Sequence, residues 1–259
     1  PHGTMDPIPA IAKIAQTRNI PCHVDACLGS FLLPFLKHLL PYQYDFTLAG
    51  VTSISCDTLK YGYAPKGTSV LMFRSRKLRK YQYSVCSGWA GGLYATPTIS
   101  GSRCSGPVAA AWATMLYMGS AQYENCALEI HQATQKIVAF ITRQIPSLFL
   151  LGRGDTSVVS FGSRSVNIFD VAEWMKRETK RKWTLAILQN PPGVHFALTM
   201  ANVSNSDEFC EDLRHAVEAE TERIANGGKS GITDSAAIYG SAASVPKQLV
   251  DELVVDYLD

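Results

Sequence analysis

Two short apolar segments each lead into a polar residue of a catalytic type, and this arrangement strongly constrains the fold. The first segment, residues 22–26, carries Asp25, and the second, the β-branched segment 51–55, is followed by Lys60. Strand-like segments alternate with helical ones, which predicts an α/β fold with a mostly parallel sheet and helices on both faces. Ligands of such sheets bind beyond the carboxyl ends of the strands. Asp25 and Lys60 are both expected there.

This pair of residues is what an enzyme needs to use pyridoxal 5'-phosphate (PLP). A lysine such as Lys60 can form a Schiff base with this cofactor, and a carboxylate such as Asp25 can keep its pyridine nitrogen protonated. Thr58 is available for a phosphate oxygen. Lys66 is a second cation, placed either to lower the pKa of Lys60 or to bind an anionic group of a substrate.

Four further residues are weaker candidates. Strand alternation puts His23 on the same face as Asp25, where it either approaches the cofactor or is a satisfied core histidine. Ser102 and Arg103 follow a glycine and suit an anion, although an ordinary exposed loop explains them equally well. Tyr94 is a candidate proton donor or stacking group, ranked below the lysines because such aromatic residues more often pack.

Composition excludes several other classes of protein. The chain has 259 residues and a net charge of +2, and no basic stripe is interleaved with aromatics, so nucleic acid is not an expected partner. The basic run 74–80 is interpreted as a solvated face. Seven cysteines without a Cys-x-x-Cys spacing argue against a disulfide framework and a zinc site, and favour a reducing compartment. No apolar run is long enough to span a membrane, and no signal peptide is visible.

Periodicity predicts the order of elements. Helices are expected at 6–18, 29–40, 107–118, 123–144, 169–180 and 207–224. Strands are expected at 22–26, 51–55, 67–73, 157–161, 183–188 and 194–199. Residues 88–106 read as irregular, and helix 107–118 is apolar on nearly all sides, which is typical of a buried helix. Residues 1–120 are expected to form part of a large PLP-binding domain. Residues 121–259 are expected to form a linking helix and a small α+β domain.

Several segments resemble a known family, the sphingosine-1-phosphate lyases. They are residues 23–29, 50–58, 60–67, 91–98 and 101–103, and, more weakly, 237–240. PLP-dependent amino-acid decarboxylases share the His-Val-Asp-Ala and lysine positions but not the run Tyr-Gly-Tyr-Ala-Pro-Lys-Gly that begins at Tyr61.

The resemblance implies a fold-type-I PLP enzyme, built from a large α/β domain and a small C-terminal domain, and forming a homodimer with shared active sites. Its reaction would be cleavage of the C2–C3 bond of phosphorylated sphingoid bases to a long-chain aldehyde and phosphoethanolamine. Lys60 would be the Schiff-base lysine, Asp25 the partner of the pyridine nitrogen, and Cys27 a neighbour of the ring. Lys66 and Ser102 of the partner subunit would bind the substrate phosphate. For a full-length protein the resemblance implies a location at the cytosolic face of the endoplasmic reticulum. Contact with the membrane would be made through a segment that is absent here, and residues 1–259 themselves would be soluble.

The chain departs from the family pattern at two positions, Leu59 in place of the usual His and Cys104 in place of the usual Pro. The family's first half, which includes the glycine-rich loop for the PLP phosphate, would precede Pro1. Two alternatives therefore stay open beside the lyase: a PLP-dependent amino-acid decarboxylase, and a non-catalytic fragment that cannot bind PLP tightly without an N-terminal half.

Overall fold

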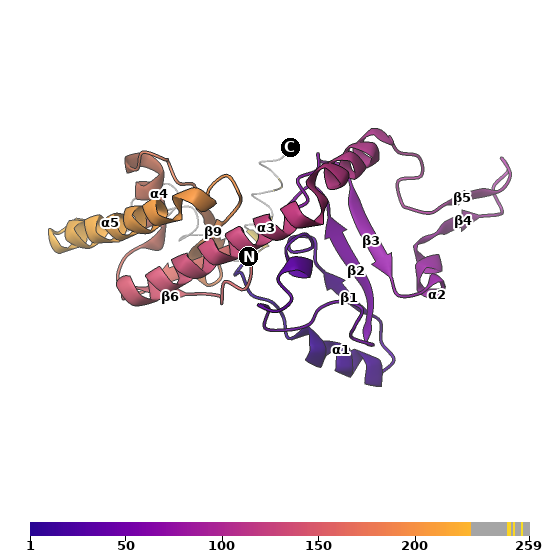
Figure 1. The fold of residues 1–259 in the computed structure, drawn as a ribbon, viewed down its shortest axis with the longest axis horizontal. Coiled ribbons are helices and arrows are strands. Elements are labelled where there is room, and N and C mark those ends of the chain that lie inside the picture. The colour runs from indigo at the N-terminus through magenta and orange to yellow at the C-terminus, as the bar shows by residue number, and fades with distance from the viewer. Residues whose placement is uncertain (229–247, 250, 252–254, 256–259) are drawn as a thin grey trace. The chain divides into compact units, whose positions relative to one another are not determined.

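The chain forms two compact units (Figure 1). The computed structural model describes residues 1–228 together with 248, 249, 251 and 255. One unit is Met5–Leu128, and the other joins Pro1–Thr4 to Glu129–Asp259. The weakly matching segment 237–240 lies outside the described residues.

The first unit is built on a three-stranded sheet in the order β1-β2-β3. Strands β1 (Cys22–Asp25) and β2 (Val51–Asp57) are parallel, whereas β3 (Ser69–Phe73) is antiparallel to β2. The expectation of a mostly parallel sheet is therefore wrong for one of the two strand pairings of this sheet. The reason is the connection: a loop, not a crossover helix, joins β2 to β3, and a short loop reverses the chain direction.

Helix α1 (Ile8–Thr17) confirms the helix expected at 6–18, and it begins at a proline-containing first turn. Its Ala12 packs into a core with Val24, Val51 and Ile54 of the first two strands. The helix expected at 29–40 is wrong, since only one 3-10 turn, η1 (Leu33–Phe35), forms there. Pro34 has no N–H to donate within a helix, so the chain makes single turns instead.

A small hairpin extends from the β1–β3 sheet (Figure 1). After β3 come α2 (Arg76–Arg79) and the turn η2 (Lys80–Gln82), and then β4 (Ser84–Cys86) pairs with β5 (Tyr94–Thr96). The expectation that 88–106 is irregular throughout is therefore wrong for β5. A strand of three residues is too short for its alternation to be recognised in a sequence.

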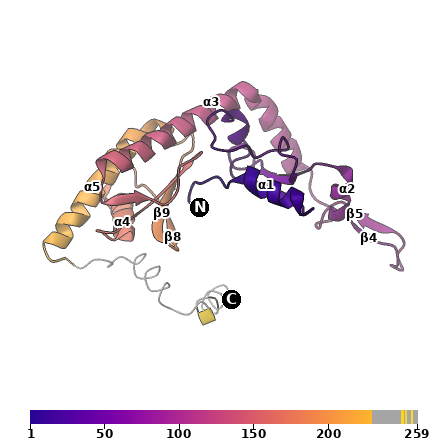
Figure 2. The ribbon, with the colours of Figure 1, turned by 90° about the horizontal axis from the view of Figure 1, so that it is seen from below.

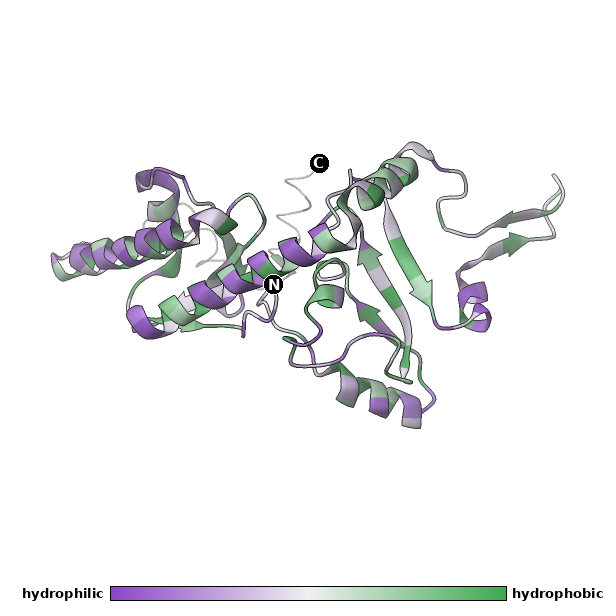
Figure 3. Ribbon diagram, in the orientation of Figure 1, coloured by the Kyte–Doolittle hydropathy of each residue, from purple (hydrophilic) through white to green (hydrophobic). Residues whose placement is uncertain are grey.

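The long helix α3 (Gly106–Gln144) merges the helices expected at 107–118 and 123–144. Gly119, with φ 63° and ψ 169°, interrupts it. The expectation that 107–118 is buried is wrong for the described chain, although Figure 3 shows how apolar this segment is. Large apolar side chains lie exposed on it: Val108, Trp112, Leu116 and Tyr117. An apolar pattern shows that a helix needs cover, but it does not show what supplies the cover.

The second unit is an antiparallel sheet in the order β6-β7-β9-β8. Its strands are β6 (Leu148–Leu150), β7 (Val158–Ser163), β8 (Ala186–Gln189) and β9 (Pro192–Ala197). Helix α4 (Ile168–Glu178) packs against β9 and against α5 (Ser206–Ala225), which follows the turn η3 (Val203–Asn205), as Figure 2 shows. In the core, the rings of Phe196 and Phe209 stack with their centroids 4.1 Å apart. The expected helices and strands of this unit are confirmed, and β6 is an addition.

No helix in the described part of the chain combines the length and the apolar character needed to cross a membrane.

Candidate active site

One face of the β1–β3 sheet gathers polar side chains. In β1, Cys22 and Val24 are buried, whereas His23 and Asp25 are exposed. The parallel register pairs His23 with Ser53 and Asp25 with Ser55. Paired residues of neighbouring strands share a face, so the prediction that His23 and Asp25 lie on one side of the sheet is confirmed. We call this surface the polar face.

A hydrogen-bond network fixes Asp25 on the polar face. The backbone N–H of Cys27 and the hydroxyl of Ser55 both donate to Asp25 Oδ1, at 3.0 and 3.1 Å. The Cys27 thiol in turn donates to Ser55 Oγ at 3.2 Å. The ring nitrogens of His23 lie 2.8 Å from Ser53 Oγ and 3.2 Å from Ser55 Oγ.

These contacts decide which groups carry charge. The backbone N–H of Cys27, followed by the Cys27 thiol, holds the pKa of Asp25 below its ordinary value, and Ser55 adds to the effect. Asp25 is therefore an anion at neutral pH. Burial is the main cause that raises the pKa of the Cys27 thiol to about 11. The polar face thus presents the ionised carboxylate of Asp25 beside a neutral thiol, which suits a partner that carries a proton on nitrogen.

Lys60 lies in the loop that follows β2. Its Nζ is 3.0 Å from Asp57 Oδ2, and its side chain is 36 % exposed, against 18 % for Asp57. The nearby Ser69 hydroxyl is the main cause that lowers the pKa of Asp57, and the hydrogen bond from Lys60 also lowers it. An ion pair thus holds the ammonium group of Lys60 at the end of the strand.

Ser53, Ser55 and Asp57 also belong to this site, and they were not predicted from the sequence. Their signal was alternation, because every second residue of β2 points to the face that carries Asp25. It becomes readable only when the register against β1 is known, since that register shows which set of β2 residues faces Asp25.

Thr58 is used inside the loop. Its side chain is almost fully buried, and its hydroxyl donates to the Thr68 carbonyl at 3.1 Å. The Thr68 hydroxyl oxygen lies 2.5 Å from the Thr58 hydroxyl oxygen. The structure therefore gives Thr58 a role in closing the loop, and its predicted contact with a cofactor phosphate stays a prediction.

The remaining candidates, Lys66, Tyr94, Ser102 and Arg103, are exposed. Tyr94 lies in β5, where its ring meets Trp89 edge-on at 6.3 Å. Within the described residues, no hydrogen bond or ion pair joins any of the four to Asp25, Cys27 or Lys60. Their proposed role in substrate binding stays a prediction.

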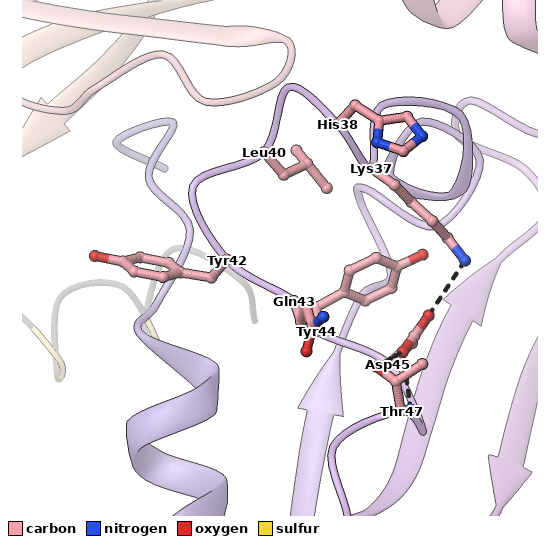
Figure 4. A pocket seen from close by; sticks show the side chains of 8 residues that line it. All are labelled: Lys37, His38, Leu40, Tyr42, Gln43, Tyr44, Asp45 and Thr47. Carbon is pink, nitrogen blue, oxygen red and sulfur yellow. Dashed lines mark hydrogen bonds and ion pairs between the residues drawn. The ribbon is translucent and has the colours of Figure 1, made fainter.

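A separate cavity of about 260 Å³ lies in the loop between β1 and β2 (Figure 4). Lys37 and Asp45 form an ion pair at 3.5 Å within its lining. Asp45 also accepts hydrogen bonds from the N–H and hydroxyl of Thr47. Because these charged groups already satisfy one another, the cavity is a poorer candidate for chemistry than the polar face.

Comparison with solved structures defines the class of protein. The chain superposes on the sphingosine-1-phosphate lyase of Burkholderia pseudomallei with a TM-score of 0.78 and 37% identity, over 88% of this chain and 52% of that one. A Lactobacillus brevis glutamate decarboxylase gives 0.67 at 18% identity, over 83% and 52% of the two chains. An Escherichia coli cysteine desulfurase gives 0.63 at 14%, over 82% and 55%. The fold is that of fold-type-I PLP enzymes, over part of their chains.

Comparison with curated protein sequences points to one kind of enzyme within this class. The chain is 42% identical to the sphingosine-1-phosphate lyases of Arabidopsis thaliana and Saccharomyces cerevisiae, along its whole length and over 47% and 44% of theirs. No family model matches it. The chain is thus homologous to sphingosine-1-phosphate lyases along its whole length, and it spans about half the length of the curated relatives that it matches.

Proposed function

We propose that these residues form the lysine-bearing part of a PLP-dependent lyase that cleaves the C2–C3 bond of phosphorylated sphingoid bases. The products would be a long-chain aldehyde and phosphoethanolamine. The observation that carries the proposal is the polar face, where an ionised Asp25 is fixed on one strand and Lys60 follows the adjacent parallel strand. Homology to lyases along the whole chain supports this choice.

The residues present fit PLP. Asp25 would keep the proton on the ring nitrogen, since its own pKa is lowered and it stays ionised. Cys27, held neutral by burial, would lie beside the ring without competing for that proton. His23 shares the face and would limit the movement of the ring. When bound, PLP supplies an electron-withdrawing ring that stabilises the carbanion left by bond cleavage.

Lys60 has to part from Asp57 to react. In the described chain, the carboxylate of Asp57 holds the ammonium group at 3.0 Å. One proton of the ammonium group has to pass to a base, either the Asp57 carboxylate or water, before the amine can attack a carbonyl group. Asp57 therefore holds the Lys60 side chain at the end of β2 until the amine is used.

Substrate binding and assembly form the less direct part of the proposal. Lys66 and Arg103 are cations suited to the substrate phosphate, with Ser102 and Tyr94 as hydrogen-bonding groups. Ser102 would act from the partner subunit of a homodimer with shared sites. We infer that the whole protein is located at the cytosolic face of the endoplasmic reticulum. The decarboxylase alternative has support from the fold alone, at 18% identity.

Trapping and product analysis test the proposal. Borohydride reduction in the presence of PLP, followed by peptide mass spectrometry, should locate the cofactor on Lys60. Lys60→Ala should abolish this labelling, whereas Lys13→Ala, an exposed lysine of α1, should leave it intact. The whole protein should release aldehyde from a phosphorylated long-chain base. Labelling of another lysine, or carbon dioxide from an amino acid without aldehyde, would contradict the proposal.

A further inference from the structure

A tyrosine of helix α3 closes the loop that carries Lys60. The Tyr123 hydroxyl donates to the carbonyl of Gly62 at 2.8 Å, and the Tyr123 side chain is only 5 % exposed. Gly62 follows Lys60 by two positions. The donor and the acceptor belong to the same compact unit, Met5–Leu128.

Two backbone bonds of this loop are local. The N–H of Tyr63 donates to the Lys60 carbonyl at 3.2 Å, and that of Ala64 donates to the Thr58 carbonyl at 3.0 Å. These bonds set the shape of the turn, but they do not attach its tip to the rest of the unit. The bond from Tyr123 does so, from a residue 61 positions away.

The loop is tightly constrained at the contact itself. A Cβ atom on Gly62 would lie 2.4 Å from the Thr58 carbonyl oxygen and 2.8 Å from the ring of Phe31. Tyr63 adopts φ 58°, a left-handed conformation that is unfavourable for a residue with a side chain. A strained turn of this kind persists only where its surroundings hold it.

The Tyr123 ring is itself fixed by aromatic neighbours. Ring centroids of Phe31, Phe35 and Tyr63 lie 5.1, 6.1 and 6.5 Å from that of Tyr123. Burial raises the pKa of Tyr123, so its hydroxyl keeps its proton at neutral pH and remains a donor.

We propose that Tyr123 is a positioning residue for Lys60, because its hydroxyl fixes the Gly62 carbonyl and thereby the backbone that directs the lysine amine. The inference rests on the proposed role of Lys60. Without the hydroxyl, the turn exchanges between conformations, and the amine spends less time directed toward the polar face.

The near-isosteric change Tyr123→Phe tests this inference, since it keeps the ring and removes one hydrogen bond. The control is Tyr117→Phe on the same helix, at a side chain that is 90 % exposed. In the cofactor-free protein, hydrogen exchange at the amides of Tyr63 and Ala64 should become about 2- to 12-fold faster in Tyr123→Phe, the range expected for one hydrogen bond. Amides of β2 should be unchanged, and the control should match the wild type.

A second readout addresses the amine directly. The rate at which PLP labels Lys60, trapped by borohydride, is divided by the rate at which acetic anhydride acetylates the same lysine. This ratio should fall about 2- to 12-fold in Tyr123→Phe. Unchanged exchange, exchange that rises equally across the protein, or an unchanged ratio would overturn the positioning role. If PLP fails to label Lys60 in the wild type, the proposed function fails and the role of Tyr123 in it fails as well. If PLP labels Lys60 in the wild type and Tyr123→Phe has no effect, only the positioning role is overturned.

Discussion

Ser55 shares one hydroxyl among three side chains, and its bonds fix their proton positions. Its single proton goes to Asp25 Oδ1, so its lone pairs accept from the Cys27 thiol and from His23 Nε2. His23 must then carry a proton on Nε2. In the neutral ring, Nδ1 is therefore an acceptor, and Ser53 donates to it. One serine thus sets the tautomer of a histidine and adds to the lowering of the pKa of a carboxylate.

The interactions of Asp25 and Asp57 make the free energy of unfolding depend on pH in the acid range. The pKa values of Asp25 and Asp57 are lower in the folded protein than their ordinary values, so near those values the unfolded chain binds more protons. Their contribution to the free energy of unfolding is complete above about pH 4–5 and is lost as the pH falls through the folded-state pKa values. We expect Ser55→Ala to lower the free energy of unfolding by about 1 kcal/mol at pH 7.

Urea unfolding between pH 3 and 7 measures this effect. The difference between Ser55→Ala and the wild type should shrink as Asp25 becomes protonated at low pH. Glu124→Gln, at an exposed position of α3, is the control and should show a pH-independent difference. A Ser55→Ala deficit that stays constant down to pH 3 would contradict the link to Asp25.

The positions of Asp25, Lys60 and His23 on or after their strands could be predicted from the sequence, because strand alternation and placement at a strand end are local properties. Thr58 was a different case. Its residue type suits a phosphate, but the structure uses its hydroxyl to bind Thr68, a partner ten positions away. Spacing alone does not show which of two acceptors a hydroxyl will choose.

Among the helices and strands, the backbone path of α3 depends on one glycine, Gly119. At φ 63° and ψ 169°, Gly119 occupies a region that is essentially restricted to glycine. Gly119→Ala should therefore lower the free energy of unfolding by about 1–3 kcal/mol. Gly106→Ala, at the start of the same helix, meets no atom closer than 3.6 Å and is the matched control. It should be neutral, or should stabilise the protein by up to about 1 kcal/mol.

Chemical denaturation of both variants checks this prediction. Equal effects of the two substitutions would show that the backbone conformation at Gly119 carries no special cost. The sequence placed helices on both sides of this glycine, but it did not show whether they form one helix or two. The same limit applies to β3, since the strand was expected from its residues whereas its direction depends on a loop.

On the scale of the whole molecule, the described chain leaves much apolar surface uncovered. The exposed apolar residues of α3 are joined by others on the hairpin and the segments flanking it: Tyr81, Val85, Trp89, Leu93 and Ile99. Patches of this kind mark interaction surfaces or promote association. The composition predicted a buried helix here, and only the three-dimensional arrangement shows that the described residues do not bury it.

We therefore expect the 259-residue chain to self-associate and to hold PLP weakly when it is studied alone. Sedimentation velocity over a range of concentrations should show species larger than a monomer. Trp112→Arg should shift the distribution toward the monomer, and Leu39→Arg, at a single exposed leucine of a loop, should not. A monomer at all concentrations that also binds PLP tightly would contradict this expectation.

The register of β1 against β2 has a consequence for how a family of this kind can vary. The polar face is carried by residues of one parity, 23 and 25 on one strand and 53, 55 and 57 on the next. A single-residue deletion inside β2 would turn its serines to the opposite side while leaving nearly every amino acid in place. A deletion in the loop between the strands would shift the numbering and preserve the pairing. Related chains are therefore free to gain or lose length between Cys27 and Gly50, and far less free within the seven residues that follow.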